Sequence, residues 1–359
     1  MPRGLRDPCC APFAWPAFIG LALIAGCSRR SPTPTSEPSA KPTPSAASSA
    51  TRVPPPAESA SATPAVAPSA APAASQQPAA TKGTPPPSYA WLASEAGKAL
   101  AVDGTLATRI KPPPGYSRIQ IAPGSFGEWL RALPMAPEST PVLRFDGSVA
   151  HAADDEYVAG VVAIDIGSAD LQQSADVVIR LHAEWLWSRD QRDAISYQGG
   201  TKLNMPLSRW EKGQRIISQG PNPFWAVQTK PAPADYSEFR RYLDIVFTWA
   251  NSASLARRAE PVEATTLTPG DFFLHTKPPG HAAIVLDIAE KPSGERVALL
   301  GQALNPTESV HVIRPGRATA WFSLRPGHAL VTAHSAAFSW DELRRMKASD
   351  DGKASEKPE

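Results

Sequence analysis

Three polar side chains have the types and the order along the chain that nucleophilic catalysis requires. Ser174 carries a hydroxyl, His281 an imidazole and Gln302 a side-chain amide. A serine hydroxyl attacks a carbonyl only when a general base within about 3 Å takes its proton, and imidazole most often serves as that base. An amide oxygen beside the imidazole would orient the ring. Asn305, which follows shortly after Gln302, is the alternative for that orienting role.

Ser174 falls near the start of a predicted helix. In the segment 171–187 apolar residues recur every three or four positions after a turn that ends at Asp170, so we expect a helix capped by Asp170. Free N–H groups and the dipole at a helix start favour developing negative charge. Gln172 and Gln173 stand beside Ser174, and we predict that their amides, together with that of Asn305, would bind an oxyanion or a substrate there.

His281 lies where a loop becomes a strand. Residues 272–274 are apolar, residues 277–280 read Lys-Pro-Pro-Gly, and residues 282–286 form an apolar run of buried-strand length. A histidine at such a junction is fixed by the strand and reachable from the loop, as a general base must be. The alternative is a histidine that only hydrogen-bonds its neighbours. Residues 296–302 read as the next strand.

The remaining pattern predicts an α+β domain with an antiparallel sheet. Further elements are expected as helices at 125–133 and from Asp235 onward, strands at 142–145, 157–166 and 309–313, a loop-rich region at 188–234 and a last helix that begins at Ser339.

The first 27 residues read as a secretory signal. Arg3 and Arg6 precede an apolar core at residues 13–24, which is too short for a permanent membrane span. The segment then ends Leu-Ile-Ala-Gly-Cys27, which resembles a bacterial lipobox. That resemblance implies cleavage before Cys27 and fatty acyl chains, such as palmitate, on the new N-terminus. With Ser28 next, it implies an outer-membrane lipoprotein facing the periplasm. An ordinary cleaved signal peptide is the alternative.

Composition divides the rest of the chain. Forty of the 359 residues are proline, and residues 28–88 consist largely of Pro, Ala, Ser and Thr, so we expect a disordered tether there. Aromatic residues begin at Tyr89, and residues 89–346 are long enough for one globular domain. Residues 347–359 form a charged tail without apolar residues, which we expect to be disordered.

Several classes of protein are disfavoured. A net charge of +2 does not indicate nucleic-acid binding, and all three cysteines lie in residues 1–27, so the domain has no thiol nucleophile or cysteine ligand. The seven histidines are scattered and no nucleotide-binding glycine pattern occurs, so we expect neither a metal nor another cofactor. His275 and His281 could approach each other, and a metal between them is the alternative.

The order of the three catalytic candidates resembles that of papain-like folds. There a helix carries the nucleophile, one strand the base, and the next strand an orienting amide. Gly270-Asp271 followed by Gly280-His281-Ala-Ala-Ile-Val resembles the cell-wall-cleaving branch, the NlpC/P60 amidases and peptidases. Over about residues 109–325 the chain also resembles an uncharacterised bacterial domain family often found on lipoproteins. The phrases that carry this second resemblance are PPPGYSRI, GSFGEWLRALP, DLQQSADVVIRLHAEWLW, FRRYLDIVF and PGDFFL followed by PGHAAIVLD.

The sequence departs from the papain-like plan at the nucleophile. That plan requires a cysteine at the helix start, and this chain has Ser174. A thiol is driven to thiolate by a helix end and an imidazolium, whereas a hydroxyl needs a true general base. Three functions therefore remain open. The domain could bind cell-wall peptide or glycan with catalysis weakened or lost, hydrolyse cell-wall amides with Ser174 and His281, or dock another envelope protein.

Overall fold

A computed structural model describes residues 86–227 and 230–347 of the chain. The predicted signal segment with its lipidation at Cys27, residues 28–85 of the predicted tether and the residues of the tail after Lys347 lie outside the described residues and stay predictions. Within the described part, no helix combines the length and apolar character needed to cross a membrane.

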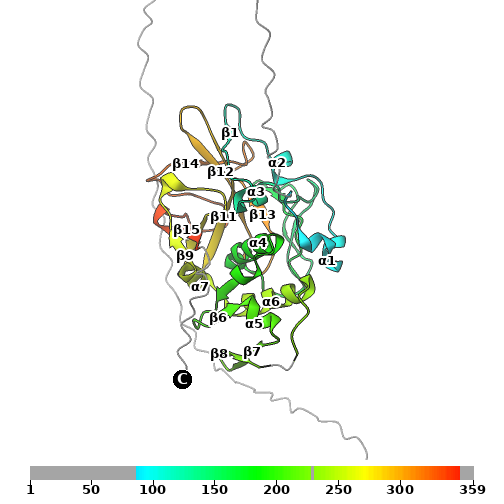
Figure 1. The fold of residues 1–359 in the computed structure, drawn as a ribbon. Helices are drawn as coiled ribbons and strands as arrows, with labels where there is room; N and C mark the ends of the chain where they lie inside the picture. Colours follow the sequence, from blue (N-terminus) through cyan, green and yellow to red (C-terminus); the bar gives the residue numbers. More distant parts are fainter. Residues whose placement is uncertain (1–85, 228–229, 348–359) are drawn as a thin grey trace, which may run out of the picture. The chain divides into compact units, whose positions relative to one another are not determined.

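A nine-stranded antiparallel sheet forms the centre of the domain (Figure 1). Its main order is β4-β13-β12-β11-β10-β15-β9, while β1 pairs with β11 and β14 with β12. The strands are β1 (Ser117–Arg118), β4 (Val158–Val161), β9 (Ala259–Pro261), β10 (Phe272–His275), β11 (His281–Glu290), β12 (Arg296–Gln302), β13 (His311–Ile313), β14 (Phe322–Leu324) and β15 (Leu343–Met346). Together with the helices, this sheet confirms the predicted α+β class.

The middle strand β11 is buried on both faces. Ala282, Ile284 and Leu286 belong to the larger apolar core, whereas Ala283 and Val285 belong to a second core on the opposite face. This division follows from the alternation of side chains along a strand. Because both faces are covered, the apolar run after His281 reads as continuous rather than alternating in polarity.

Helices cover the face of the sheet that carries the larger core, and α4 lies across β11 in Figure 1. The helices are α1 (Glu95–Lys98), α2 (Leu106–Arg109), α3 (Phe126–Arg131), α4 (Ser174–Ser188), α5 (Leu207–Glu211), α6 (Tyr236–Trp249) and α7 (Ser252–Arg257). The predicted caps of α3 and α6 are confirmed, since Ser125 accepts the Glu128 N–H and Asp235 accepts the Glu238 N–H.

Three hairpins lie beside the main sheet. They are β2 (Val142–Leu143) with β3 (Val149–His151), β5 (Ser196–Gln198) with β6 (Asn204–Pro206), and β7 (Arg215–Gln219) with β8 (Asn222–Ala226). The region 188–234, which we expected to be mostly loop, therefore contains two of these hairpins and α5. Tyr197 and Trp210 bury their rings in this region and fasten it to the core.

Several sequence-based boundaries are wrong. The strands expected at 142–145, 157–166 and 309–313 are shorter and run over Val142–Leu143, Val158–Val161 and His311–Ile313. The helix expected from Leu171 with Asp170 as its cap begins at Ser174 with Gln173 as its cap, and the helix expected from Ser339 is a single 3-10 turn, Trp340–Glu342, followed by β15. At this last site the chain returns to the sheet because Leu343 pairs with Phe273 of β10 and is fully buried. Burial at the sheet thus outweighs a local capping pattern, which contributes only about 1 kcal/mol.

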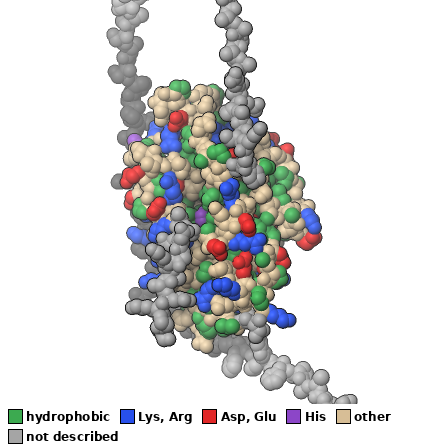
Figure 2. Space-filling model, in the orientation of Figure 1, with side chains coloured by type: hydrophobic (Ala, Val, Ile, Leu, Met, Phe, Trp, Pro, Cys, Tyr) green, Lys and Arg blue, Asp and Glu red, His purple; other side chains and the backbone are tan. Residues whose placement is uncertain are grey.

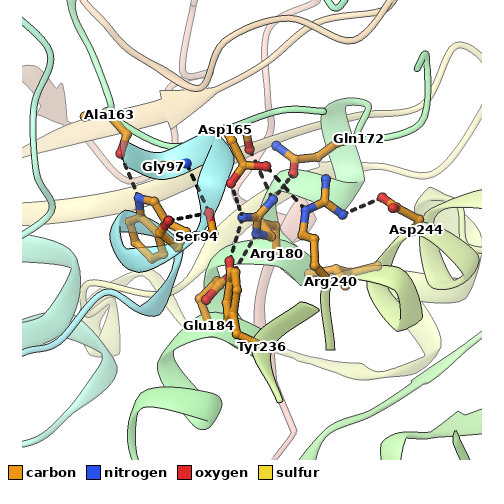
Figure 3. Close-up of polar contacts among 12 residues, drawn as sticks. Ser94, Gly97, Ala163, Asp165, Gln172, Arg180, Glu184, Tyr236, Arg240 and Asp244 are labelled. Atoms are coloured by element: carbon orange, nitrogen blue, oxygen red, sulfur yellow. Dashed lines mark hydrogen bonds and ion pairs between the residues drawn. The ribbon is translucent and has the colours of Figure 1, made fainter. Parts of the chain in front are cut away.

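A buried ionic network fixes α4 and the turn that precedes it (Figure 3). Arg180 is fully buried, and its guanidinium pairs with Asp165 at 3.0 Å and with Glu184 at 2.8 Å. It also donates to the amide oxygen of Gln172 at 2.9 Å, while the Tyr236 hydroxyl donates to Glu184 at 2.6 Å. Arg180 thereby holds the residues just before α4 against the helix and determines where Ser174 lies.

Charges on the surface are mixed. On the face drawn in Figure 2, Lys and Arg side chains of the described residues are interspersed with Asp and Glu. A nucleic-acid-binding face usually gathers its basic residues in one patch or stripe.

Candidate active site

Ser174 is the first residue of α4, and its hydroxyl meets the ring of His281, the first residue of β11. The distance from Ser174 Oγ to His281 Nδ1 is 2.6 Å, and the N–H of Ala282 donates to the same Oγ at 2.9 Å. With one acceptor position of Oγ used by Ala282, the Ser174 hydroxyl is free to donate its proton to Nδ1. The spacing is that of a nucleophile and its general base.

Gln302 fixes the orientation of the imidazole. It ends β12, and its Oε1 lies 3.1 Å from Nε2 of His281. An amide oxygen only accepts, so Nε2 carries the proton and Nδ1 presents its lone pair to Ser174. The amide nitrogen of Gln302 in turn lies 3.5 Å from Nε2 of His311. Gln302 is fully buried, which excludes water from competing for this contact.

Strand pairing explains how distant residues meet here. His281 lies opposite His275 in the β10–β11 pair, and Ile284 lies opposite Gly301 in the β11–β12 pair. This register places the start of β11 beside the end of β12, where Gln302 stands. The start of α4 then reaches the same edge because the helix packs on β11.

Burial sets the protonation state of His281. Desolvation lowers the pKa of His281 to about 4, although the hydrogen bond to Gln302 raises it in part and His275 lowers it further. The ring is therefore neutral at pH 7 and able to accept a proton. A base with this pKa is also weaker than an exposed histidine, so it accepts the proton of a hydroxyl less readily.

Two cavities open on either side of Ser174. The first has a volume of about 510 Å³, and the second has a volume of about 360 Å³. Ser174, Gly280 and Asn305 line both cavities, so the hydroxyl stands at their junction. The rest of the first cavity is lined by the loop between β10 and β11, with further residues from the C-terminal part of the chain: His275, residues 276–279, His281, Leu304, residues 334–336 and Glu342. The rest of the second cavity is lined by the start of α4 and the end of α6 with the residues next to them: 170, 171, 173, 175, 176, 247, 248 and 250–252. A chain-like ligand could thus extend to both sides of the nucleophile.

Asn305 does not contact the imidazole. Its Oδ1 accepts the backbone N–H of Ser174 at 3.2 Å, so it holds the start of α4. Of the two residues considered for orienting the ring, Gln302 is the one in contact with His281. Asn305 remains at the junction of the two cavities, where it can reach a ligand.

Gln172 and Gln173 occupy different positions. Gln172 is fully buried, and its amide oxygen accepts from Arg180 (Figure 3). It lines neither of the two cavities. This placement gives Gln172 no access to a ligand, contrary to the expectation from sequence. Gln173 precedes α4 and lines the second cavity, where its amide donates to Asp170 at 3.0 Å. The second N–H of that amide has no acceptor among residues 86–227 and 230–347, so it is available to an oxyanion.

Asp176 is a candidate that the sequence did not single out. It lines the second cavity with 5 % of its surface exposed, and its Oδ2 accepts the N–H of Gln173 at 3.2 Å. Its Oδ1 has no hydrogen-bond partner among the described residues. Burial raises the pKa of Asp176 well above its ordinary value. Its only signal in the sequence is its position two residues after Ser174.

The wall of the first cavity contains a second histidine. His275 Nδ1 lies 2.7 Å from Glu342 Oε1, and the ring of Phe338 stacks on His275 with 4.3 Å between centroids. Ser339 and Glu342, which looked like a helix start, therefore place a carboxylate in the cavity wall. The metal considered between His275 and His281 is not supported by this arrangement, because Nδ1 of each ring already has a partner.

Comparison with known proteins identifies a domain family. No curated protein and no solved structure matches the chain, so the expected likeness to NlpC/P60 enzymes stays a prediction from the sequence. The family described as Domain of unknown function (4846) matches residues 106–345, which is about two thirds of the 359 residues. The expected uncharacterised domain family is thus confirmed, and the chain belongs to the family Domain of unknown function (4846).

Proposed function

We propose that the protein is a hydrolase of amide or other acyl bonds, with Ser174 as nucleophile, His281 as general base and Gln302 as the residue that orients the base. The observation that carries this proposal is the continuous set of contacts from Ser174 Oγ through both nitrogens of His281 to Gln302, at 2.6 Å and 3.1 Å. Such a set, next to an open cavity, is what nucleophilic catalysis by a serine needs.

The reaction follows from the positions of these atoms. Oγ of Ser174 attacks the substrate carbonyl while Nδ1 of His281 takes the hydroxyl proton. The developing imidazolium is stabilised by its Nε2–H bond to Gln302 Oε1. His281 then gives the proton to the leaving group, and a water molecule activated by the same ring hydrolyses the acyl-enzyme.

The oxyanion of the tetrahedral intermediate has donors on the side of the second cavity. In the first turn of α4 the N–H of Ser174 donates to Asn305 and that of Asp176 to the Gln173 carbonyl, so the N–H of Ala175 is left at the helix start, where the dipole favours negative charge. The side-chain amide of Gln173 lines the same cavity. These two kinds of donor correspond to the backbone and side-chain donors of known oxyanion holes.

The substrate class that we propose is a peptide of the bacterial cell wall. Two arguments support it: the papain-like arrangement of helix, base strand and amide strand, and the lipobox-like segment ending at Cys27, which would place the domain in the envelope. A cleft with a cavity on each side of the nucleophile also suits a chain cleaved in its middle.

A second function, binding of the same material without turnover, is favoured by one specific observation. Burial lowers the pKa of His281 to about 4, which makes it a weak base for a hydroxyl far less acidic than a thiol. In that case the cleft would retain peptide or glycan, and Ser174 would contribute only a hydrogen bond.

One experiment separates the two. The protein is incubated with peptidoglycan fragments while cleavage and binding are measured on the same samples. If the protein hydrolyses the fragments, new amine ends should appear with the wild type and with Ser335→Ala but not with Ser174→Ala. Ser335→Ala is the matched control because it also removes a hydroxyl from the first cavity, at a residue outside the catalytic set. Binding alone predicts retention by all three proteins and no new amines. Neither cleavage nor binding would refute both functions on this substrate.

A further inference from the structure

Behind Gln302, three side chains come together that the proposed reaction does not use. His151 of β3, Glu308 and His311 at the start of β13 each offer one ligand atom, and these atoms lie within 4.8 Å of one another. His311 is fully buried and Glu308 is 3 % exposed. Two imidazoles and one carboxylate so close together are a familiar ligand set for divalent metals.

The tautomer of His151 is fixed by a carboxylate on its other side. Nδ1 of His151 lies 3.2 Å from Oδ2 of Asp155, and Asp155 is itself held by the Tyr157 N–H at 2.7 Å. The proton of the neutral ring therefore sits on Nδ1, and Nε2 presents a lone pair. Metal-binding histidines usually carry such a carboxylate behind the ring, where it orients the ligand and increases its basicity.

That lone pair faces another electron-rich atom. Nε2 of His151 lies 3.8 Å from Oε2 of Glu308, which is too long for a hydrogen bond. On the other side of the same carboxylate, Nδ1 of His311 lies 3.7 Å from Oε1. Oε1 of Glu308 accepts the Leu304 N–H at 2.9 Å, whereas its Oε2 faces the lone pair of His151. A cation between Oε2 and that lone pair would remove this unfavourable contact between two electron-rich atoms.

The spacing suits a tetrahedral metal. Bonds of about 2.0–2.2 Å at tetrahedral angles place neighbouring ligand atoms about 3.4 Å apart. The separations of 3.8 Å and 3.7 Å run to Oε2 and Oε1 of Glu308 respectively, and one ligand atom from each residue lies within 4.8 Å of the others. To bind one ion, these side chains would therefore close in by at most about 1.4 Å. Nδ1 of His311 would exchange its contact with the Ser309 carbonyl at 3.0 Å for the metal.

The ligand types select the metal. Nitrogen ligands with one carboxylate favour zinc and its neighbours, while calcium and magnesium prefer oxygen ligands alone. The fourth position falls to water or to His334, whose ring lies 4.8 Å from that of His151. His334 also forms a neighbouring group with His151 and Asp155. The expectation that the histidines are scattered is thus wrong for three of the seven.

We propose that His151, Glu308 and His311 bind one divalent metal of the zinc class. Such an ion would join the β2–β3 hairpin to β13, two elements that come from distant parts of the chain. It would also lie one side chain from the catalytic set, because His311 Nε2 is 3.5 Å from the amide of Gln302. The site does not depend on the hydrolase proposal, since it uses none of the residues named there.

The test is a titration of the metal-depleted full-length protein with zinc chloride at neutral pH. Cys9, Cys10 and Cys27 are alkylated first, because thiolates also bind zinc. We expect one equivalent to bind and the melting temperature to rise. His151→Gln and Glu308→Gln should each weaken binding at least a hundredfold, and Asp155→Asn ten- to a hundredfold. His328→Ala removes an exposed histidine outside the cluster and should bind as the wild type does.

Two results would overturn the proposal. One is the absence of a one-to-one zinc complex in the wild-type protein. The other is equal binding by wild type, His151→Gln and Glu308→Gln, which would place the ion elsewhere. Circular dichroism checks that each variant folds. If a variant unfolds, X-ray absorption on the wild-type zinc complex decides instead: two imidazole ligands, or three if His334 is the fourth ligand, support the site, and fewer than two contradict it.

Discussion

Replacing Ser174 by cysteine would test the contact with His281 without any knowledge of the substrate. The hydroxyl lies 2.6 Å from Nδ1 of His281, at the first residue of α4. A thiol at that place would exchange its proton with the ring and form a thiolate–imidazolium pair, which alkylating reagents detect. Ser174→Cys should therefore be reactive well below the pKa of a free thiol, which is about 8.5.

The magnitude follows from opposing contributions. The pKa of His281 is lowered to about 4. Moving the proton from a thiol with a pKa of about 8.5 to this ring therefore costs about 6 kcal/mol, at 1.36 kcal/mol per pKa unit. Attraction between the two charges returns about 4 kcal/mol at ~4 Å with an effective dielectric constant of ~20. The helix start adds about 1 kcal/mol. The remaining deficit of about 1 kcal/mol leaves the ion pair in roughly one molecule in six. At pH 6 that is some fifty times more thiolate than in a free cysteine, which is ~0.3 % ionised.

The assay measures the rate of iodoacetamide alkylation at pH 5 to 9, followed by mass spectrometry of the peptide that contains residue 174. Peptide mapping separates this thiol from Cys9, Cys10 and Cys27. We expect a rate that changes little between pH 5 and 8. The matched control combines Ser174→Cys with His281→Gln, and its rate should rise about tenfold per pH unit up to pH ~8.5. If both proteins show the same tenfold rise, the Ser174–His281 contact does not exist in solution and the reasoning fails.

Three further predictions concern stability. Gln302→Leu leaves the buried Nε2–H of His281 without its acceptor and should lower the free energy of unfolding by about 1–3 kcal/mol in urea titrations; an unchanged value would mean that the contact is absent. Arg180→Met leaves Asp165 and Glu184 as buried carboxylates without a partner and should cost about 3–5 kcal/mol, whereas Arg192→Met, at a more exposed pair, should cost at most about 1 kcal/mol. Burial lowers the pKa of both His182 and His281 to about 4, from about 6.5 in the unfolded chain. Between pH ~4 and ~6.5 the unfolded chain therefore binds more protons at these rings than the folded protein does. The free energy of unfolding therefore has its full value above pH ~6.5 and falls as the pH is lowered to ~4, by up to about 3 kcal/mol for each ring. Urea titrations across this range check the loss, which should be smaller in His281→Gln, and an equal loss in that variant would contradict the lowered pKa.

The meeting of Ser174 with His281 could be predicted because strong local patterns limit where each residue can lie. The apolar period of α4 places Ser174 at the start of that helix, and the buried apolar run of β11 places His281 at the start of that strand. Choosing between Gln302 and Asn305 was not possible from sequence. That choice depends on the register of β11 with β12 and on a hydrogen bond to the first N–H of α4. Both are tertiary contacts that leave no periodic signal.

Other parts of the site depend on contacts with no local signal at all. Gln172 faces away because a buried Arg180 eight residues later binds its amide, and a helix pattern cannot reveal which polar residue the core will hold. The cluster of His151, Glu308 and His311 forms only when the β2–β3 hairpin comes to lie against the start of β13. Glu308 and His311 stand three residues apart, and that spacing is the one local hint of this cluster.

The most direct measurement of the central claim is covalent labelling of the wild-type protein with a fluorophosphonate, which reacts with serines activated by a general base. The account predicts one adduct per chain, at Ser174, with a rate that is independent of pH above ~5 and falls as His281 is protonated near pH 4. His281→Gln should lose the adduct, whereas Ser335→Ala should keep it. An unlabelled Ser174, or equal labelling in His281→Gln, would contradict the proposal that these two residues form a nucleophile and its base.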